Sequence, residues 1–324
     1  MERYIGEYTG KERGPLLICF GGMHGNEPAG IQALEIMFKL LEREPLANPD
    51  FVFSGRMIGL RGNLKAIKSN VRYHEQDLNR MWCREIVEKV KSSSEEILNF
   101  EEQELKQLIA LIHKEIETYR PEKVVVLDLH TTTAHGGIFV IATDDPESVR
   151  IGIEMHAPVI KGMLKGIQGT TLHYFNTMNF GVEMVPVTFE SGQHEDHLSV
   201  NRAIAAVTNV LRTIGCVKAE DVENRHDELL IEYSRNLPKV AELITCHHIT
   251  DADEFKMEPG YLNFQEIEKG EVLARDKFGI IQAPSSGHIL MPLYQEQGED
   301  GFFLIKKVEG VCVACCEVRV AGCE

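Results

Sequence analysis

Short apolar runs alternate with longer helix-like segments along the first two-thirds of the chain. Residues 15–20 and 124–127 are continuous apolar runs that look like buried strands. Residues 28–41, 85–119 and 198–214 are helix-like, and the second of these carries many charged positions. The alternation predicts an α/β fold with a mostly parallel or mixed sheet flanked by helices.

The pattern changes after residue 215. Residues 219–238 are polar and charged, which is typical of a connection between domains. Beyond residue 241, short strand-like runs are separated by turn sequences such as Ser285-Ser286-Gly287. We therefore predict one large domain over residues 1–217, and a linker with a small C-terminal all-β domain over residues 218–324.

Two histidines and one glutamate lie where predicted strands end. His24 and Glu27 follow the first apolar run, and His130 follows the second in Asp128-Leu129-His130. Open α/β sheets place active sites at such strand ends. Two imidazoles and one carboxylate form the ligand set of a catalytic zinc, with a fourth position left for water or substrate. The pattern predicts one Zn²⁺ per chain and a hydrolase.

A simpler explanation of His24 and Glu27 is a loop histidine beside a glutamate that stabilises a helix N-terminus. The glycine-rich loop around His24 favours the metal site, because it offers no helix face that both residues would share. Asp128 is a candidate to orient a ligating histidine. Because neighbouring strand residues face opposite ways, the sequence leaves open which histidine it reaches.

A third strand-like run, residues 185–189, leads into Glu190 and then Gly192. Metal-assisted hydrolysis needs a general base, and a carboxylate at a strand end is suited to that role. A surface glutamate at a turn is the alternative. We interpret residues 194–197, which contain two further histidines, as the polar start of the following helix.

The segment of residues 72–80 contains Arg72, Asn79 and Arg80. A guanidinium group binds a carboxylate through two parallel hydrogen bonds. It can equally stabilise the oxyanion that forms during amide hydrolysis. Residue types alone leave both roles open, together with an ordinary solvated charge cluster.

Taken in this order, the motifs resemble those of the succinylglutamate desuccinylase and aspartoacylase family of zinc deacylases, relatives of the zinc carboxypeptidases. The resemblance covers roughly the first two-thirds of the chain. It is carried by these motifs: Gly22-x-His24-Gly25-Asn26-Glu27, Asp77-Leu78-Asn79-Arg80, Asp128-Leu129-His130 and the strand end at Glu190.

The resemblance implies a zinc carboxypeptidase-like sheet and a role for each candidate residue. His24, Glu27 and His130 would bind zinc, and Glu190 would act as general base and acid. Arg72 would polarise the scissile carbonyl. The substrate contacts would come from Asn79 and Arg80, which would hold a carboxylate, and from Asn63, which falls where family members carry an asparagine near the site.

The chain departs from the family in two places. Aspartoacylases carry an arginine shortly before the catalytic glutamate, whereas residues 177–184 contain none. They also place a C-terminal tyrosine at the pocket mouth, where residues 301–304 offer two phenylalanines, so Tyr294 or Lys306 would have to substitute. The acyl group and the amine therefore stay open, and N-acetylaspartate is not assumed.

The expected activity is hydrolysis of an amide bond in a small anionic N-acyl amino acid or a related molecule. The first alternative is a zinc carboxypeptidase that acts on peptides. The second is a non-catalytic metal-binding homologue, although such a protein would have no use for Glu190.

Charge and hydropathy narrow the location and the partners. The net charge of −16 over 324 residues argues against nucleic-acid binding, which requires a basic face. No apolar stretch is long enough to span a bilayer, and the N-terminus lacks a signal-peptide pattern, so we expect a cytoplasmic protein without membrane contact. The sequence leaves the oligomeric state open, including a homo-oligomer.

The chain has eight cysteines, four of them near the C-terminus at Cys312, Cys315, Cys316 and Cys323. Their spacing suggests a structural metal site, but residues 310–320 also have the pattern of one buried strand, which we favour. The pair His247-His248 is a weaker metal candidate. Neighbours on a strand face opposite ways, so both imidazoles would not serve one site.

Overall fold

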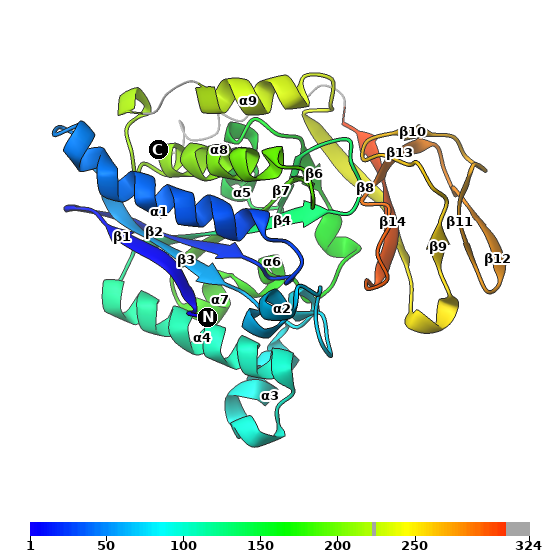
Figure 1. Ribbon diagram of the computed structural model, residues 1–324, viewed down its shortest axis with the longest axis horizontal. Helices are drawn as coiled ribbons and strands as arrows, with labels where there is room; N and C mark the ends of the chain where they lie inside the picture. Colours follow the sequence, from blue (N-terminus) through cyan, green and yellow to red (C-terminus); the bar gives the residue numbers. More distant parts are fainter. Residues whose placement is uncertain (222–224, 309–324) are drawn as a thin grey trace, which may run out of the picture.

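The computed structural model describes residues 1–221 and 225–308 (Figure 1). Its dominant element is an 11-stranded sheet with the order β1-β3-β2-β4-β7-β5-β6-β8-β14-β13-β10. Pairing of β2 with β3, of β2 with β4 and of β4 with β7 is parallel, whereas the pairing of β5 with β7 is antiparallel, so the sheet is mixed. The strands are β1 (Tyr4–Thr9), β2 (Glu12–Gly21), β3 (Ser54–Arg61), β4 (Lys123–Thr132), β5 (Phe139–Ala142), β6 (Val159–Lys161), β7 (Glu183–Gln193), β8 (Val240–His248), β10 (Glu266–Ile267), β13 (Gly287–Leu290) and β14 (Asp300–Lys307).

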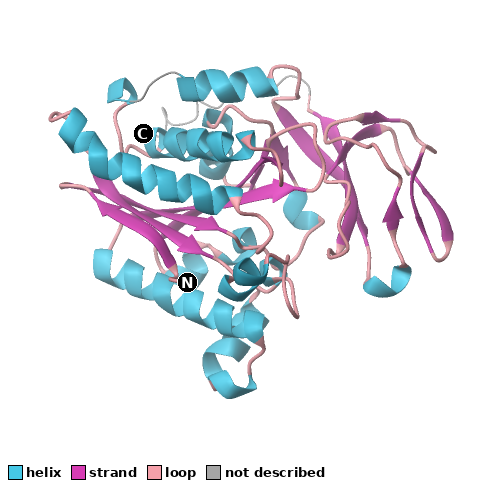
Figure 2. Ribbon diagram, viewed as in Figure 1, coloured by secondary structure: helices cyan, strands magenta, loops and turns pink. Residues whose placement is uncertain are grey.

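Helices cover both faces of the sheet, as Figures 1 and 2 show. One face carries α1 (Ala29–Ala47), α5 (Pro146–Glu154), α8 (Leu198–Thr213) and α9 (Arg225–Ser234). The opposite face carries α2 (Leu64–Ser69), α3 (Arg84–Ser92), α4 (Phe100–Tyr119), α6 (Thr171–Tyr174) and α7 (Thr177–Phe180). None of the helices in the described part of the chain has an apolar stretch of membrane-spanning length.

The central strands are buried on both faces, which explains their continuous apolar runs. Leu17 and Cys19 of β2 belong to the core that also contains residues of α1 and α8. Leu16 and Ile18 belong to the core on the α4 side. Successive strand residues point to opposite faces, so a strand between two helical layers needs apolar residues at every position.

The sheet continues into a C-terminal β region. Strand β8 pairs with β6 in parallel and with β14 in antiparallel orientation, and a separate three-stranded sheet packs beyond them. That sheet is formed by β9 (Lys256–Met257), β11 (Val272–Asp276) and β12 (Gly279–Gln282). The predicted fold class is therefore confirmed: a mixed sheet flanked by helices, with a C-terminal β region. The domain boundary at residues 217/218 stays a prediction.

Two local expectations need correction. Residues 85–119 do not form one helix, because α3 and α4 are separated by residues 93–99, and Asn99 starts α4 with a capping box that involves Glu102. Residues 219–238 are not only a connection, since they contain α9. The predicted strand over residues 310–320 and the four C-terminal cysteines lie outside the described residues.

Candidate metal centre and adjoining cavity

The site begins where the apolar rows of β4 and β7 change to polar residues. On β4, Val126 is followed on the same face by Asp128 and His130. On β7 the corresponding positions are Thr188 and Glu190. The strands are paired in parallel, with Asp128 opposite Thr188 and His130 opposite Glu190. The register alone therefore places the predicted general base beside a predicted metal ligand.

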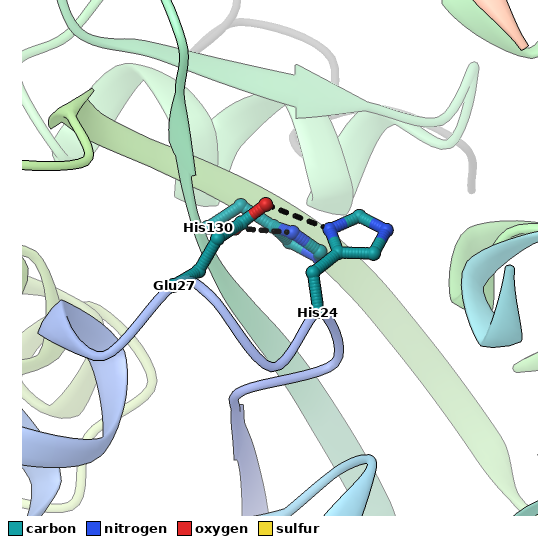
Figure 3. Close-up of side chains that lie close together, drawn as sticks. All are labelled: His24, Glu27 and His130. Atoms are coloured by element: carbon teal, nitrogen blue, oxygen red, sulfur yellow. Dashed lines mark hydrogen bonds and ion pairs between the residues drawn. The ribbon is translucent and has the colours of Figure 1, made fainter. Parts of the chain in front are cut away.

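The loop between β2 and α1 brings His24 and Glu27 against this row (Figure 3). Glu27 lies between the two imidazoles, with Oε1 2.8 Å from His24 Nδ1 and Oε2 3.1 Å from His130 Nδ1. All three side chains are buried. The three predicted metal ligands, which are far apart in sequence, thus meet at the carboxyl ends of parallel strands.

The far nitrogen of each imidazole faces a carboxylate. His24 Nε2 lies 3.0 Å from Asp77 Oδ1, and His130 Nε2 lies 3.1 Å from Asp128 Oδ1. Metal-ligating histidines usually carry such a carboxylate on the nitrogen that does not face the metal. The structure thus answers the question about Asp128, which faces His130, and adds Asp77, whose role the sequence did not reveal.

These features fit a metal ion. One donor atom from each of His24, Glu27 and His130 lies within 4.8 Å of the others. Glu190 Oε2 is buried and has no hydrogen-bond partner among the described residues. A His–His–Glu set that leaves a coordination position open beside a free carboxylate oxygen is the arrangement of a catalytic metal site.

The buried carboxylates and imidazoles of the cluster favour one another's charged forms. Burial opposes ionisation of Glu27, but His24 and His130 hold its pKa well below the usual range. Burial likewise disfavours a charged His130, yet Asp128 and Glu27 keep the pKa of this imidazole well above its usual value.

Glu190 differs from Glu27 in its surroundings. Burial raises the pKa of the Glu190 carboxyl group, and the charges of Glu27 and Asp128 raise it further, while His130 and Arg72 oppose this change. A carboxylate that is poorly solvated and has a free oxygen accepts a proton readily. Its surroundings thus favour proton transfer.

Arg72 lies directly beside the candidate metal ligands. Its Nε and Nη2 donate to Asp77 Oδ2 at 3.2 and 2.9 Å, and its Nη1 lies 3.7 Å from Glu27 Oε1. Asp77 consequently binds His24 through one oxygen and Arg72 through the other. Burial opposes ionisation of Asp77, but His24 and Arg72 keep the pKa of this carboxyl group well below the usual range.

A buried glutamate in α4 shapes the segment that carries Arg72. The Glu101 carboxylate accepts hydrogen bonds from the backbone N–H groups of His74, Glu75 and Gln76. The backbone N–H of Gly25 in turn donates to the carbonyl oxygen of Arg72 at 3.1 Å. The metal-ligand loop and the arginine segment are therefore held together through main-chain contacts.

Close approach explains the glycine at position 25. A Cβ atom added to Gly25 would lie 2.1 Å from the carbonyl carbon of Ala66, a backbone atom that cannot move aside easily. Only a residue without a side chain lets the loop between β2 and α1 pack this tightly against α2.

Asn63 lies apart from the cavity. Its Oδ1 accepts from the backbone N–H of Ala66 as the N-cap of α2, and its Nδ2 donates to Glu101 at 3.0 Å. It is not among the residues that line the cavity. The geometry gives Asn63 a part in holding the loop and does not support the expected substrate contact.

Asn79 and Arg80 do line the cavity. Arg80 Nη2 donates to Asp300 Oδ2 at 2.6 Å, and Nη1 donates to the carbonyl oxygen of Asn79. Asn79 Oδ1 accepts from the backbone N–H of Thr171 at 3.3 Å. Arg80 is thus already bound to one carboxylate of the protein and retains other N–H groups for a ligand.

The cavity has a polar end and an apolar wall. The metal ligands, Arg72 and Glu190 line the polar end, together with His194. His194 Nδ1 lies 2.6 Å from the hydroxyl of Thr131, and burial lowers the pKa of this imidazole. The sequence pattern favoured the polar start of a helix here and kept a contact with the site as the lesser alternative. The apolar wall is formed by Ile141, Leu164, Ile167, Leu172, Met291, Leu293 and Phe303.

Neither proposed replacement for the family's tyrosine lines this cavity. The Tyr294 hydroxyl accepts from the backbone N–H of Tyr261 at 2.7 Å, and the Lys306 ammonium group lies 3.4 Å from Glu242. Of the two phenylalanines in residues 301–304, Phe303 faces the cavity and Phe302 packs in the core of the C-terminal β region.

Fold and site together define an α/β protein with a candidate metal centre at the carboxyl ends of parallel strands. A family model described as the succinylglutamate desuccinylase/aspartoacylase catalytic domain matches residues 13–214. Because this match spans more than half of the sequence, the chain belongs to that family.

Individual relatives agree with this assignment. A probable aspartoacylase from Nostoc sp. is 33% identical over 129 residues, which cover 39% of this chain and 38% of the relative. A second probable aspartoacylase, from Acaryochloris marina, is 29% identical over 129 residues, 40% of this chain and 39% of the relative. The alignments therefore span about two-fifths of these curated relatives.

Solved structures extend the likeness in fold to nearly the whole chain. A succinylglutamate desuccinylase/aspartoacylase from Rhodobacter sphaeroides aligns with a TM-score of 0.61 at 16% identity, covering 93% of this chain and 87% of the other. A succinylglutamate desuccinylase from Vibrio parahaemolyticus aligns with a TM-score of 0.60 at 16% identity, covering 92% and 83%. The shared fold includes the C-terminal β region.

Proposed function

We propose that the protein is a zinc-dependent hydrolase that cleaves the amide bond of an N-acyl amino acid or a related small molecule. One observation carries this proposal. Glu190, with a buried and unpartnered oxygen, is the register partner of His130, which belongs to a His–Glu–His set. Family membership supports the same reaction class.

Zinc suits the donor set of His24, Glu27 and His130 better than other divalent metals, because imidazole and carboxylate ligands with an open position are typical of hydrolytic zinc. Zn²⁺ bound there supplies a Lewis acid that polarises a carbonyl group and makes water more nucleophilic. Asp77 and Asp128 face the far nitrogens of the two histidines, so a proton kept on each far nitrogen would leave each Nδ1 free to bind the ion.

Glu190 moves the proton. Its free Oε2 accepts a proton from the attacking water as the oxygen of that water bonds to the carbonyl carbon. The same carboxyl group then donates this proton to the amide nitrogen as the carbon–nitrogen bond breaks, which yields a carboxylic acid and an amine. Burial favours this exchange, because it brings the protonated and the ionised forms of Glu190 closer in free energy.

The arginines complete the site. Arg72, whose Nη1 lies 3.7 Å from Glu27 Oε1, is placed to donate to the carbonyl oxygen as negative charge develops on it. Arg80 and Asn79 also line the cavity, where free N–H groups of Arg80 would bind a substrate carboxylate. An acidic protein repels anions at long range, but screening over about 8 Å lets these local charges dominate.

The decisive experiment measures amine release from a panel of N-acetyl and N-succinyl amino acids by the zinc-loaded protein. Glu190→Ala is assayed beside Glu195→Gln, an exposed glutamate on the same segment. We expect turnover of at least one compound that requires Glu190 and zinc and that Glu195→Gln retains. Turnover of unblocked peptides instead would identify a carboxypeptidase. Zinc binding without any hydrolysis would identify a non-catalytic homologue.

A further inference from the structure

A second set of metal-type donors lies beyond Arg80, on β8 and β14. Cys246 and His248 are two residues apart on β8 and therefore share a face of the strand. Asp300, the first residue of β14, is the register partner of His248. Successive side chains of a strand point to opposite faces, so His247 lies on the other face from His248. The ring of His247 stacks on the ring of Phe302, with 5.0 Å between the two centroids.

The three donor atoms form a compact triangle. His248 Nδ1 lies 2.8 Å and Cys246 Sγ lies 3.3 Å from the same oxygen, Asp300 Oδ1, and Sγ lies 3.6 Å from Nδ1. Zinc binds sulfur at about 2.3 Å and nitrogen or oxygen at about 2.0–2.2 Å. Ligands at those lengths on a tetrahedral ion are roughly 3.3–3.6 Å apart. Small shifts of these side chains would bring all three into coordination.

We propose that Cys246, His248 and Asp300 form a second binding site for a zinc-like divalent cation. The site is distinct from the His–Glu–His set because it adds a thiolate, a ligand that selects zinc over magnesium or calcium. The imidazole of His248 is 62% exposed, so water can complete a fourth position. An ion held by three side chains and open to solvent exchanges readily, in contrast to a closed structural site.

The charges around the triangle suit a cation. The second oxygen of Asp300, Oδ2, accepts a hydrogen bond from Arg80, and this bond fixes the orientation of the carboxylate. Glu299 adds a further negative charge 3.8 Å from Arg80 Nε. The negative charges of a Cys246 thiolate and these two carboxylates together balance the positive charges of a divalent ion and the guanidinium group.

The position of Asp300 connects the second site to the cavity. Asp300 and Arg80 both line the cavity, whereas Cys246 and His248 line a separate surface depression. An ion on Asp300 Oδ1 would fix the carboxylate that holds Arg80. The second site would thereby set the orientation of an arginine that lines the same cavity as the candidate metal centre.

Cobalt titration of the full-length protein tests the proposal, because thiolate-to-cobalt charge transfer absorbs in the near ultraviolet and the His–Glu–His set has no thiolate. We expect the metal-free protein to bind two equivalents of Co²⁺ and to develop this band. Cys246→Ser should bind one equivalent without the band, and His248→Gln should weaken the cobalt binding that produces it. His24→Ala should lose the other equivalent and keep the band.

Cys83→Ser is the matched control, since Cys83 is a free thiol that belongs to neither set of donors, and this variant should keep the band. His248 is exposed, so His248→Gln reports on the site without disturbing the fold. A wild-type protein that binds one equivalent without the band would overturn the proposal. A band that persists in Cys246→Ser would do so as well, because the thiolate would then come from another cysteine.

Discussion

His130 and Glu190 are register partners on adjacent parallel strands, so the hydrogen bonds of the sheet fix their separation. Neither side chain depends on a mobile loop for its place. The position of Glu190 beside the candidate metal ligands is therefore a property of the sheet itself, and variants of this carboxylate should change chemistry without changing structure.

Glu190→Gln should reduce kcat/KM by roughly 10²–10⁴-fold, because the amide cannot take the proton of the attacking water. Zinc content should stay unchanged, since Glu190 does not belong to the proposed set of ligands, His24, Glu27 and His130. The variant should also be at least as stable as the wild type, because burial disfavours the Glu190 carboxylate and raises its pKa. Steady-state kinetics, metal analysis and thermal melts measure the three effects. Loss of zinc with the activity would assign Glu190 to the metal instead.

Asp77→Asn should weaken metal binding by roughly 10–100-fold, because His24 loses the carboxylate on its Nε2. Asp128→Asn should act similarly through His130. Competition with a chromophoric chelator gives the affinities, with the exposed Asp144→Asn as control. Asp77→Asn should in addition lower kcat, since Arg72 loses its anchor, and equal kcat losses in the two variants would argue against that role of Arg72.

Glu101→Gln should lower the free energy of unfolding by about 1–3 kcal/mol, the usual cost of leaving buried donors without partners. The carboxylate accepts three backbone N–H groups and the side chain of Asn63, and an amide NH₂ would face some of those donors. Urea denaturation measures the loss against the exposed Glu96→Gln. Activity should fall as well, because the same backbone carries Arg72. Unchanged stability would mean that the segment keeps its shape without Glu101.

Glu147 should make the free energy of unfolding depend on pH. Hydrogen bonds from Arg150 and from Lys123 lower the pKa of Glu147 from 4.5 to about 2. A group with a lowered pKa stabilises the fold above its unfolded pKa and loses that contribution as the pH falls toward its folded pKa. The stability difference between wild type and Glu147→Gln should therefore be largest above pH ~5 and shrink as the pH falls to ~3. Urea unfolding across this pH range measures the stability difference. A difference that does not change with pH would show that the pKa of Glu147 is not lowered in the folded protein.

The sequence alone predicted the candidate site residues that lie close to a strand end. His24, Glu27, His130 and Glu190 each follow or end an apolar run, and the rule that parallel strands end at one edge brings them together. The fold class followed from the alternation of continuous apolar runs with helix-like segments, because a strand covered on both faces must be apolar at every position.

The remaining residues depend on contacts between distant segments. Glu101 lies on a charged helix, where a glutamate is ordinarily solvated, and only the packing of α4 against residues 74–76 buries it. Asp300 has no local pattern that would connect it with Arg80. His194 follows Glu190 closely, but its direction depends on the path of the chain after Gly192. Asn63 was expected at the substrate because of the resemblance, whereas the structure uses it as a helix cap.

The continuous sheet has a consequence for how substrate preference can diverge. Strand β14, which brings Asp300 and Phe303 to the cavity, belongs to the same sheet as the strands of His130 and Glu190, yet it comes from a remote stretch of sequence. Substitutions there can alter which molecule fits while the candidate metal ligands and the proposed general base stay aligned. The choice of substrate and the chemical step are thus separable targets for selection, and for engineering, within one rigid frame.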